Sequence, residues 1–316
     1  MQKPLRSKTD WHKCCEVSAG LHNRMSKLVE TIAVPNTLKQ GAAGIEQLYE
    51  IVAKTPRAVW YILDMKAVKF VEPCGVIALL TVIRFLSEMT RNRVLIQNLD
   101  EQVYLYLHRM NLFHVAAAWL KPLETLSEEW SRNAHTVNLL ELTEVTGYDD
   151  MTAVIERARG IFAPWLSSND LPNLLRVISE LCQNIYQHSG DTHGCVLIQK
   201  YQSEAQNRIS ICLSVGDLGC GIRASLIGRF KGLGDEPLDF VRAAMDGSFT
   251  SRRHGRGGLG LRTVRDITTA YGGCVTVRSE TAGVTDWGKS GINSSGQLTY
   301  IAGTQVNVKM RVSNYC

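Results

Sequence analysis

The stretch Ile209-Ser-Ile-Cys-Leu-Ser-Val215, continued by Gly-Asp217-Leu-Gly219-Cys-Gly221, decides how this sequence is interpreted. Its first seven residues predict an apolar strand, which delivers Asp217 into a loop. Glycines follow two and four residues later, at Gly219 and Gly221. A carboxylate is a hydrogen-bond acceptor only, so it suits an exocyclic amine such as that of adenine, and glycines let the backbone close on a base. Taken alone, these residues favour an ordinary Asp-Gly turn.

A second stretch lies further along the chain, Gly255-Arg256-Gly257-Gly258-Leu259-Gly260-Leu261, and it runs straight into a predicted helix that ends near Ala270. A glycine-rich loop that opens a helix presents free N–H groups and the positive end of the helix dipole, which favours phosphate. Arg252, Arg253 and Arg256 add positive charge beside it. The stretch is not a P-loop, because no Lys-Ser/Thr follows its last glycine. A dinucleotide fingerprint is excluded as well, since a long loop rather than a strand precedes it.

The third stretch, Glu180-Leu-Cys-Gln-Asn184, lies on a helix predicted to start at Asn169-Asp170-Leu-Pro and to run to about His188. Residues four apart share one helix face, so the Glu180 carboxylate and the Asn184 amide project side by side. This pair suits a general base next to a magnesium ligand. A solvated helix face would carry the same residues.

The composition of the whole chain indicates what class of protein carries these three stretches. The chain has 316 residues, 45% of them hydrophobic and 21% charged, with a formal net charge of +5. These values are typical of a globular protein of about two domains, and they do not indicate nucleic-acid binding. Of the 26 glycines, only Gly20, Gly41, Gly44, Gly75, Gly147 and Gly160 precede residue 190. The glycine distribution therefore places the ligand chemistry in the C-terminal part.

The N-terminal part alternates predicted strands and helices from about Leu28 to Val115, which indicates a small α/β layer domain. The run Ala58–Asp64 is apolar up to its final Asp and β-rich, as in a buried strand, and Gly75–Met89 predicts an amphipathic helix. The longest apolar stretch, Gly75–Ile83, is too short to span a bilayer, and no signal peptide is recognised. We therefore expect a cytoplasmic protein with reduced cysteines and no membrane span.

In their order along the chain, the three stretches resemble the GHKL superfamily of ATP-binding domains, which includes type II topoisomerases, heat-shock chaperones and histidine kinases. The resemblance covers about Val137–Val312. It implies a Bergerat-type α/β sandwich, ATP and Mg²⁺ as cofactors, Asn184 as the metal ligand and Glu180 as the catalytic base. It further implies that Asp217 accepts from the adenine amine, that Thr304 reaches adenine through water, and that Gly228–His254 is the mobile portion of a lid. The remaining nucleotide-binding residues that it implies are Gly219, Gly221, Arg256, Gly257, Gly258, Leu259 and Gly260.

A second resemblance concerns about Leu28–Val115. Asp64 to Gly75, followed by an apolar helix, is similar to the STAS domain of anti-sigma-factor antagonists. In phosphorylated members a hydroxyl in this turn accepts phosphate from a GHKL kinase. Here the turn is Glu72-Pro73-Cys74-Gly75, so the acceptor hydroxyl is missing. The resemblance therefore implies a docking or regulatory module rather than a phosphate acceptor.

Together these observations predict a STAS-like α/β domain at 1–120, a connector at 121–136 and a GHKL ATP-binding domain at 137–316. The primary hypothesis is an ATPase that acts as a nucleotide-dependent switch on a regulatory or effector protein partner, bound through the STAS-like domain. A homo-oligomer is a further form left open by the sequence. Two alternatives stay open: a serine/threonine protein kinase of the anti-sigma-factor type, and a scaffold that binds nucleotide without hydrolysing it. A histidine kinase is disfavoured, because no dimerisation helix with an exposed His precedes the domain.

Overall fold

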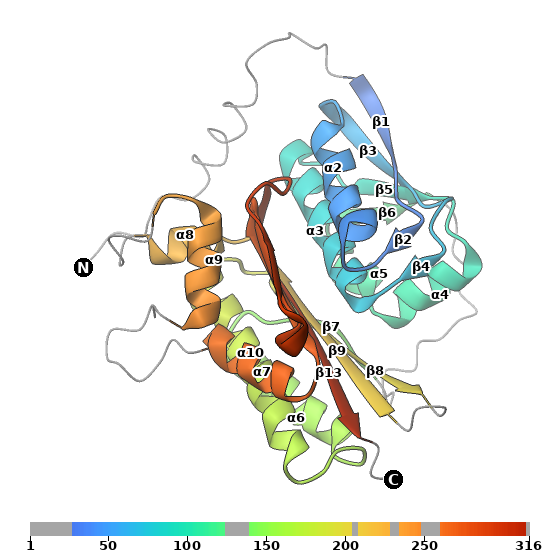
Figure 1. The fold of residues 1–316 in the computed structure, drawn as a ribbon. Helices are drawn as coiled ribbons and strands as arrows, with labels where there is room; N and C mark the ends of the chain where they lie inside the picture. Colours follow the sequence, from blue (N-terminus) through green and yellow to red (C-terminus); the bar gives the residue numbers. More distant parts are fainter. Residues whose placement is uncertain (1–26, 124–138, 204–207, 228–233, 248–259, 314–316) are drawn as a thin grey trace.

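The computed structural model describes residues 27–123, 139–203, 208–227, 234–247 and 260–313. Within these ranges the chain forms a four-stranded parallel sheet, a small two-stranded sheet and a seven-stranded sheet. The parallel sheet and its helices lie on one side of the seven-stranded sheet, and a second group of helices covers the other side (Figure 1).

The N-terminal part is built on the parallel sheet, whose strand order is β1-β3-β5-β6. Right-handed crossovers through helices are the usual way to join parallel strands, which explains the alternation seen in the sequence. The strands are β1 (Lys27–Ala33), β3 (Ala58–Asp64), β5 (Val94–Gln97) and β6 (Leu120–Pro122), with β2 (Thr37–Leu38) pairing β4 (Phe70–Val71) beside them. The helices are η1 (Ala42–Glu46), α2 (Gln47–Lys54), α3 (Pro73–Thr90), α4 (Glu101–Arg109) and α5 (Leu112–Val115).

Helix α3 is the central helix of the molecule. Pro73 occupies its first turn, where a missing N–H costs nothing. Gly75 is required by packing, because a Cβ there would lie 2.2 Å from the carbonyl oxygen of Leu38. By length and composition α3 could cross a membrane, yet 78% of it is buried inside the structure, as for the core helix of a globular protein. The absence of a membrane span therefore stays a prediction.

The C-terminal part is built on the seven-stranded sheet, whose order is β12-β11-β10-β13-β9-β8-β7 and whose neighbours all pair antiparallel. Its strands are β7 (Leu139–Glu144), β8 (Cys195–Ser203), β9 (Arg208–Asp217), β10 (Cys274–Glu280), β11 (Ala282–Asp286), β12 (Ile292–Ser295) and β13 (Ile301–Ser313). Its helices are α6 (Tyr148–Phe162), α7 (Asp170–Asn184), η2 (Ile185–Ser189), α8 (Gly221–Leu226), α9 (Pro237–Asp246), α10 (Gly260–Ala270) and η4 (Gly288–Ser290).

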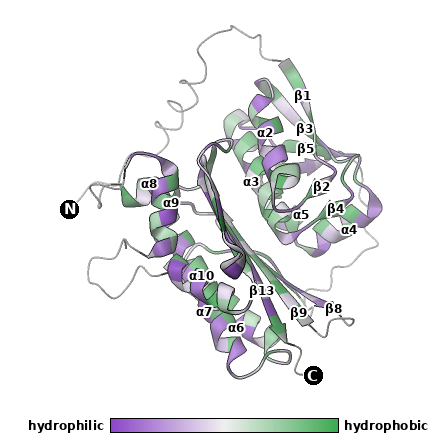
Figure 2. Cartoon of the chain, in the orientation of Figure 1, coloured by the Kyte–Doolittle hydropathy of each residue, from purple (hydrophilic) through white to green (hydrophobic). Residues whose placement is uncertain are grey.

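Strand β8 of the seven-stranded sheet contributes to a core on each face, because alternate residues of a strand point to opposite sides. On β8, Val196 and Ile198 join the core beneath α6, α7 and α10. Cys195 and Leu197 instead join the core that contains α3. Colouring by hydropathy shows α3 largely green, whereas α6, α7 and α10 carry both purple and green (Figure 2). The two parts of the chain therefore share the core that contains α3, and a second core lies on the other face of the seven-stranded sheet.

The expected fold class is confirmed at the level of its architecture: a parallel α/β sheet in the N-terminal part, and an antiparallel sheet with helices, consistent with a GHKL sandwich, in the C-terminal part. The sequence patterns did not predict β11, β12, α8 or α9. Helix α9 lies inside the segment Gly228–His254, which was expected to be mobile. Phe240 and Val241 anchor α9 in the core. Residues 228–233 and 248–254 of that segment lie outside the described residues.

Candidate functional site

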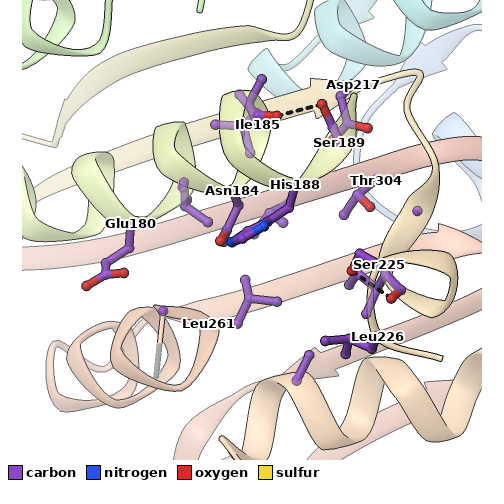
Figure 3. Close-up of a pocket in the computed structure, with 17 residues that line it drawn as sticks. Glu180, Asn184, Ile185, His188, Ser189, Asp217, Ser225, Leu226, Leu261 and Thr304 are labelled. Atoms are coloured by element: carbon purple, nitrogen blue, oxygen red, sulfur yellow. Dashed lines mark hydrogen bonds between the residues drawn. The ribbon is translucent and has the colours of Figure 1, made fainter. Parts of the chain in front are cut away.

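Helix α7 carries two of the expected site residues on its exposed side. Its apolar stripe, which includes Leu174, Ile178 and Leu181, is buried in the core. Glu180 and Asn184 are thereby turned away from the sheet, and their side chains point together toward α10 (Figure 3). A Cβ on Gly260, the first residue of α10, would lie 3.0 Å from Glu180 Oε2 and 3.7 Å from Asn184 Oδ1. The start of α10 therefore closes directly over the carboxylate and the amide.

Asp217 ends strand β9 and pairs in register with Thr304 on β13. Its Oδ1 accepts a hydrogen bond of 2.8 Å from the N–H of Gly219. Gly303 allows the two strands to meet here, because φ is +78° and a Cβ would lie 2.0 Å from the carbonyl oxygen of Asp217. The carboxylate and the threonine hydroxyl are thus held at one end of the site by the central pair of strands.

The Asp217 side chain is only 7% exposed. Burial raises the pKa of Asp217 to about 7, against the opposing effect of the Gly219 hydrogen bond, and the nearby Asp191 charge raises it further. The pKa of this carboxyl therefore lies close to neutral pH. A hydrogen-bond donor supplied by a ligand would favour its ionised form.

One pocket joins these groups. It encloses about 890 Å³, open solvent at its mouth included, which is within the ~300–1,000 Å³ typical of ligand sites. Glu180 and Asn184 lie at one end of the close-up, and Asp217 and Thr304 lie at the other (Figure 3). Apolar side chains also line the pocket and are Ile185, Val215, Ile222, Leu226 and Val306. An elongated ligand with a flat base at one end and charge at the other fits this arrangement.

Most of the predicted site residues that the structure describes line this single pocket. They are Glu180, Asn184, Asp217, Gly221, Gly260 and Thr304. Gly219 is not part of its lining; a Cβ there would lie 2.1 Å from the carbonyl oxygen of Ser189, so this glycine permits packing of the loop against η2. Arg256, Gly257, Gly258 and Leu259 lie outside the described residues.

His188 also lines the pocket, although the sequence analysis gave it no role. It lies one turn beyond Asn184, and its ring points into the space between Asn184 and Thr304 (Figure 3). The spacing Glu180, Asn184, His188 repeats every four residues, so helical periodicity alone would have placed all three on one face. The helix was predicted to run to about His188, but the shared face of Glu180 and Asn184 was not extended to that residue.

The oxygen donors near Glu180 are better suited to Mg²⁺, which water and phosphate would also coordinate, than to a metal ion held entirely by protein side chains. Within the described residues no group of three or more His, Cys, Asp or Glu side chains could hold a metal ion. The amide oxygen of Asn184 lies beside the Glu180 carboxylate, and both residues line the pocket. Mg²⁺ keeps several waters and usually takes one or two protein oxygens together with substrate phosphates. Asn184 would supply such an oxygen.

Residues 169–312 match the family model described as histidine kinase-, DNA gyrase B- and HSP90-like ATPase. The match begins just before α7 and ends in β13, so it contains every pocket residue named above. These residues therefore form a GHKL-type ATP-binding domain. The N-terminal sheet lies outside the matched residues.

A curated relative is similar over a shorter stretch. The hybrid signal transduction histidine kinase D of Dictyostelium discoideum is 32% identical over 123 residues, which are 38% of this chain. The aligned stretch spans 7% of that protein. The similarity is thus to a short stretch of a much longer protein.

Proposed function

We propose that this protein is a Mg-ATP-dependent ATPase whose nucleotide state controls a protein partner. One observation carries the proposal: a single pocket in the GHKL-type domain holds Asp217 and Thr304 at one end and Glu180 and Asn184 at the other. The first pair matches the needs of adenine, and the second matches the needs of a metal-bound triphosphate.

Each group has a distinct part in the proposed reaction. Asp217 accepts a hydrogen bond from the adenine amine, and the apolar walls of the pocket contact the faces of the base. Asn184 supplies an oxygen to Mg²⁺, which when bound would screen the phosphate charge and orient the terminal phosphate. Glu180 accepts a proton from the attacking water as that water approaches phosphorus. Gly260, at the start of α10, lies over Glu180 and Asn184 and helps to exclude bulk water from them.

The proposed nucleotide-dependent switch follows from the position of the start of α10 over Glu180 and Asn184. The γ-phosphate would lie where α10 begins, so its presence or loss changes what the start of α10 contacts. The N-terminal parallel sheet, which resembles a STAS domain, is proposed as the docking or regulatory module for the partner. We propose a cytoplasmic location for the complex, with a homo-oligomer as one form of it.

Isothermal titration of the full chain with ATP and Mg²⁺ tests the binding step. We expect saturable heat with the wild-type protein, and much weaker magnesium-dependent binding with Asn184→Ala. The control is Asn173→Ala, which removes an amide of the same helix that contacts Tyr271 rather than the pocket. No heat with the wild type would overturn the proposal.

A protein kinase acting on serine or threonine is the second candidate. The position of Glu180 favours it, because a carboxylate that activates water can equally accept the proton of a protein hydroxyl. The protein would be incubated with radiolabelled ATP and candidate antagonist proteins. Label on a partner hydroxyl supports the kinase, whereas release of free phosphate alone supports the ATPase.

A further inference from the structure

One face of α3 lies against the strands that carry the adenine end of the pocket. Ile77, Thr81 and Arg84 lie at positions i, i+4 and i+7 of this helix, which places them on one face. All three are buried, with exposed fractions of 2%, 4% and 4%. They belong to the N-terminal part, outside the ATP-binding domain.

Two of these side chains contact residues adjacent to the site. Ile77 packs so closely on Gly216 that a Cβ there would lie 2.4 Å from Ile77 Cγ2. The Gln305 amide donates a hydrogen bond of 3.2 Å to the Thr81 hydroxyl. Gly216 precedes Asp217, and Gln305 follows Thr304. Since neighbouring residues on a strand face opposite sides, α3 contacts the back of the two strands whose front carries Asp217 and Thr304.

Arg84 makes the most specific contact. Its two terminal nitrogens donate to the two Asp191 carboxylate oxygens at 2.9 and 2.7 Å, and one of them also donates to the carbonyl oxygen of His193. Asp191 Oδ2 in turn accepts the N–H of Leu218 at 2.8 Å. Leu218 directly follows Asp217, so a chain of charge-assisted hydrogen bonds runs from α3 to the loop that holds the adenine-binding carboxylate.

The Arg84–Asp191 ion pair is buried, and each of its members makes further contacts. The Arg84 and Asp191 side chains are 4% and 6% exposed. The Arg84 guanidinium also lies 5.1 Å from the ring centre of Trp119, in the N-terminal part. Burial alone would raise the pKa of Asp191, but the Arg84 hydrogen bonds and charge hold it below its usual value. Asp191 is therefore an ionised acceptor for the Leu218 N–H, and it depends on Arg84 to remain so.

We propose that Arg84 is a positioning residue of the nucleotide site, acting through Asp191 to fix the loop of Asp217, so that the N-terminal part sets the affinity and base selectivity of the ATP-binding domain. This inference rests on the proposed ATP binding. Breaking a buried pair by removing one partner leaves an unpaired charge, whose relaxation here would move the Leu218 N–H and with it Asp217. An ordinary interface contact would instead affect stability alone.

The test compares titrations of the full chain with MgATP and with MgGTP, whose base lacks the amine that Asp217 recognises. Arg84→Met removes the charge and keeps most of the apolar stem, and Arg84→Lys keeps the charge without the two-pronged contact. Glu46→Gln is the matched control. Glu46 also forms a carboxylate–guanidinium pair between the two parts, with Arg278 at 2.8 Å, but that pair makes no contact with Leu218.

We expect MgATP to bind about ten-fold more weakly to Arg84→Met, a step that corresponds to one unit in log Kd. The ratio of ATP to GTP affinity should fall with it. Arg84→Lys should give an intermediate loss, and Glu46→Gln should keep both the wild-type affinity and the wild-type ratio. Asp191→Asn should reproduce the loss, and its combination with Arg84→Met should be less than additive.

The outcomes separate the two proposals. If the wild-type protein fails to bind MgATP, the proposed function fails and this inference fails with it. If the wild type binds, and folded Arg84→Lys and Asp191→Asn keep its affinity and ATP preference, only the inference is overturned. If Arg84→Met does not fold, the affinities and ATP preferences of Arg84→Lys and Asp191→Asn test the inference in its place. An equal loss of ATP preference in Glu46→Gln would also overturn it, because the effect would then belong to the interface as a whole.

Discussion

Among single residues, Glu180 and Asn184 lie four apart on α7 and face the same pocket, yet the proposed reaction assigns them separate tasks. Asn184 contributes to binding through Mg²⁺, whereas Glu180 acts only as water attacks. An interaction made only in the transition state affects turnover and not ground-state binding. The two residues can therefore be separated by experiment.

Glu180→Gln should bind MgATP with nearly the wild-type Kd and lose turnover by about 100-fold or more, the usual contribution of a general base. The glutamine keeps the size of the side chain and removes its ability to take a proton. Phosphate release and isothermal titration measure the two quantities. Turnover at the wild-type rate would show that Glu180 is not the base.

The Asp217 carboxylate should make nucleotide affinity depend on pH. Its pKa is about 7 in the protein without nucleotide. Since the adenine amine needs an ionised acceptor, MgATP affinity should fall by about ten-fold per unit as pH drops below 7. Titrations at pH 6, 7 and 8 measure this slope, with nucleotide protonation subtracted by the variant Asp217→Asn. The variant should bind more weakly and show no inflection near pH 7.

The same carboxylate should oppose folding at high pH. The pKa of Asp217 is about 7 in the folded protein and 3.8 when the side chain is exposed in the unfolded chain, so the folded protein holds this proton more tightly. The contribution of Asp217 to the free energy of unfolding is complete below pH 3.8, and it is lost as pH rises through the folded-state pKa of about 7. Asp217→Asn should therefore raise the thermal midpoint more at pH 8 than at pH 5. An equal shift at both values would contradict a titrating Asp217.

The residues of the site were predictable only where they follow a local pattern. Glu180, Asn184 and Asp217 stand in short stretches whose spacing already indicates their chemistry. The Arg84–Asp191 pair gave no such signal, because 107 residues separate its members. Contacts of this kind depend on how α3 docks on the sheet, which no local pattern encodes.

Among the elements, the loop between β9 and α8 (residues 218–220) can pack closely only because it contains a glycine. Gly219→Ala would place a Cβ 2.1 Å from the carbonyl oxygen of Ser189, which must then move. Because η2 carries His188 into the pocket, we expect both lower stability and weaker MgATP binding. Thermal denaturation and titration measure the two effects.

Gly160 on α6 is the matched control for that substitution. A Cβ there would meet nothing within 4 Å. Gly160→Ala should stabilise the protein by about 0.5–1 kcal/mol, since glycine in a helix costs backbone entropy. Loss of nucleotide binding in Gly160→Ala, rather than in Gly219→Ala, would contradict this assignment.

Elements with strong apolar patterns were predicted well, and weakly patterned ones were missed. Ala58–Asp64 is the whole of β3, as its uninterrupted apolar run indicated. Strand β12 reads Ile-Asn-Ser-Ser and is largely exposed, so no hydrophobic period marks it. Helix α9 was hidden by the glycines on either side of it, although Phe240 and Val241 bury its inner face. Tertiary pairing and packing, rather than local preference, decide these cases.

At the scale of the whole molecule, the two parts of the chain should unfold together. Leu139, Leu142 and Leu197 of the C-terminal part belong to the same apolar cluster as α3. Calorimetry should therefore show one transition, and MgATP should shift that transition as a unit, as expected for a ligand that binds only the folded state. Two transitions, of which only one responds to MgATP, would show that the parts are independent.

The burial of α3 also limits how a signal could pass between the two parts. A domain that swings on a linker moves many ångströms, but α3 is packed on the parallel sheet and against the seven-stranded sheet at once. Close-packed interiors do not slide freely; they change by small repacking steps between discrete arrangements. An event on the N-terminal sheet would thus reach the nucleotide as a displacement of a side chain's width. Distance probes placed on the outer surfaces would record almost nothing, whereas a fluorescent adenine analogue in the pocket would respond.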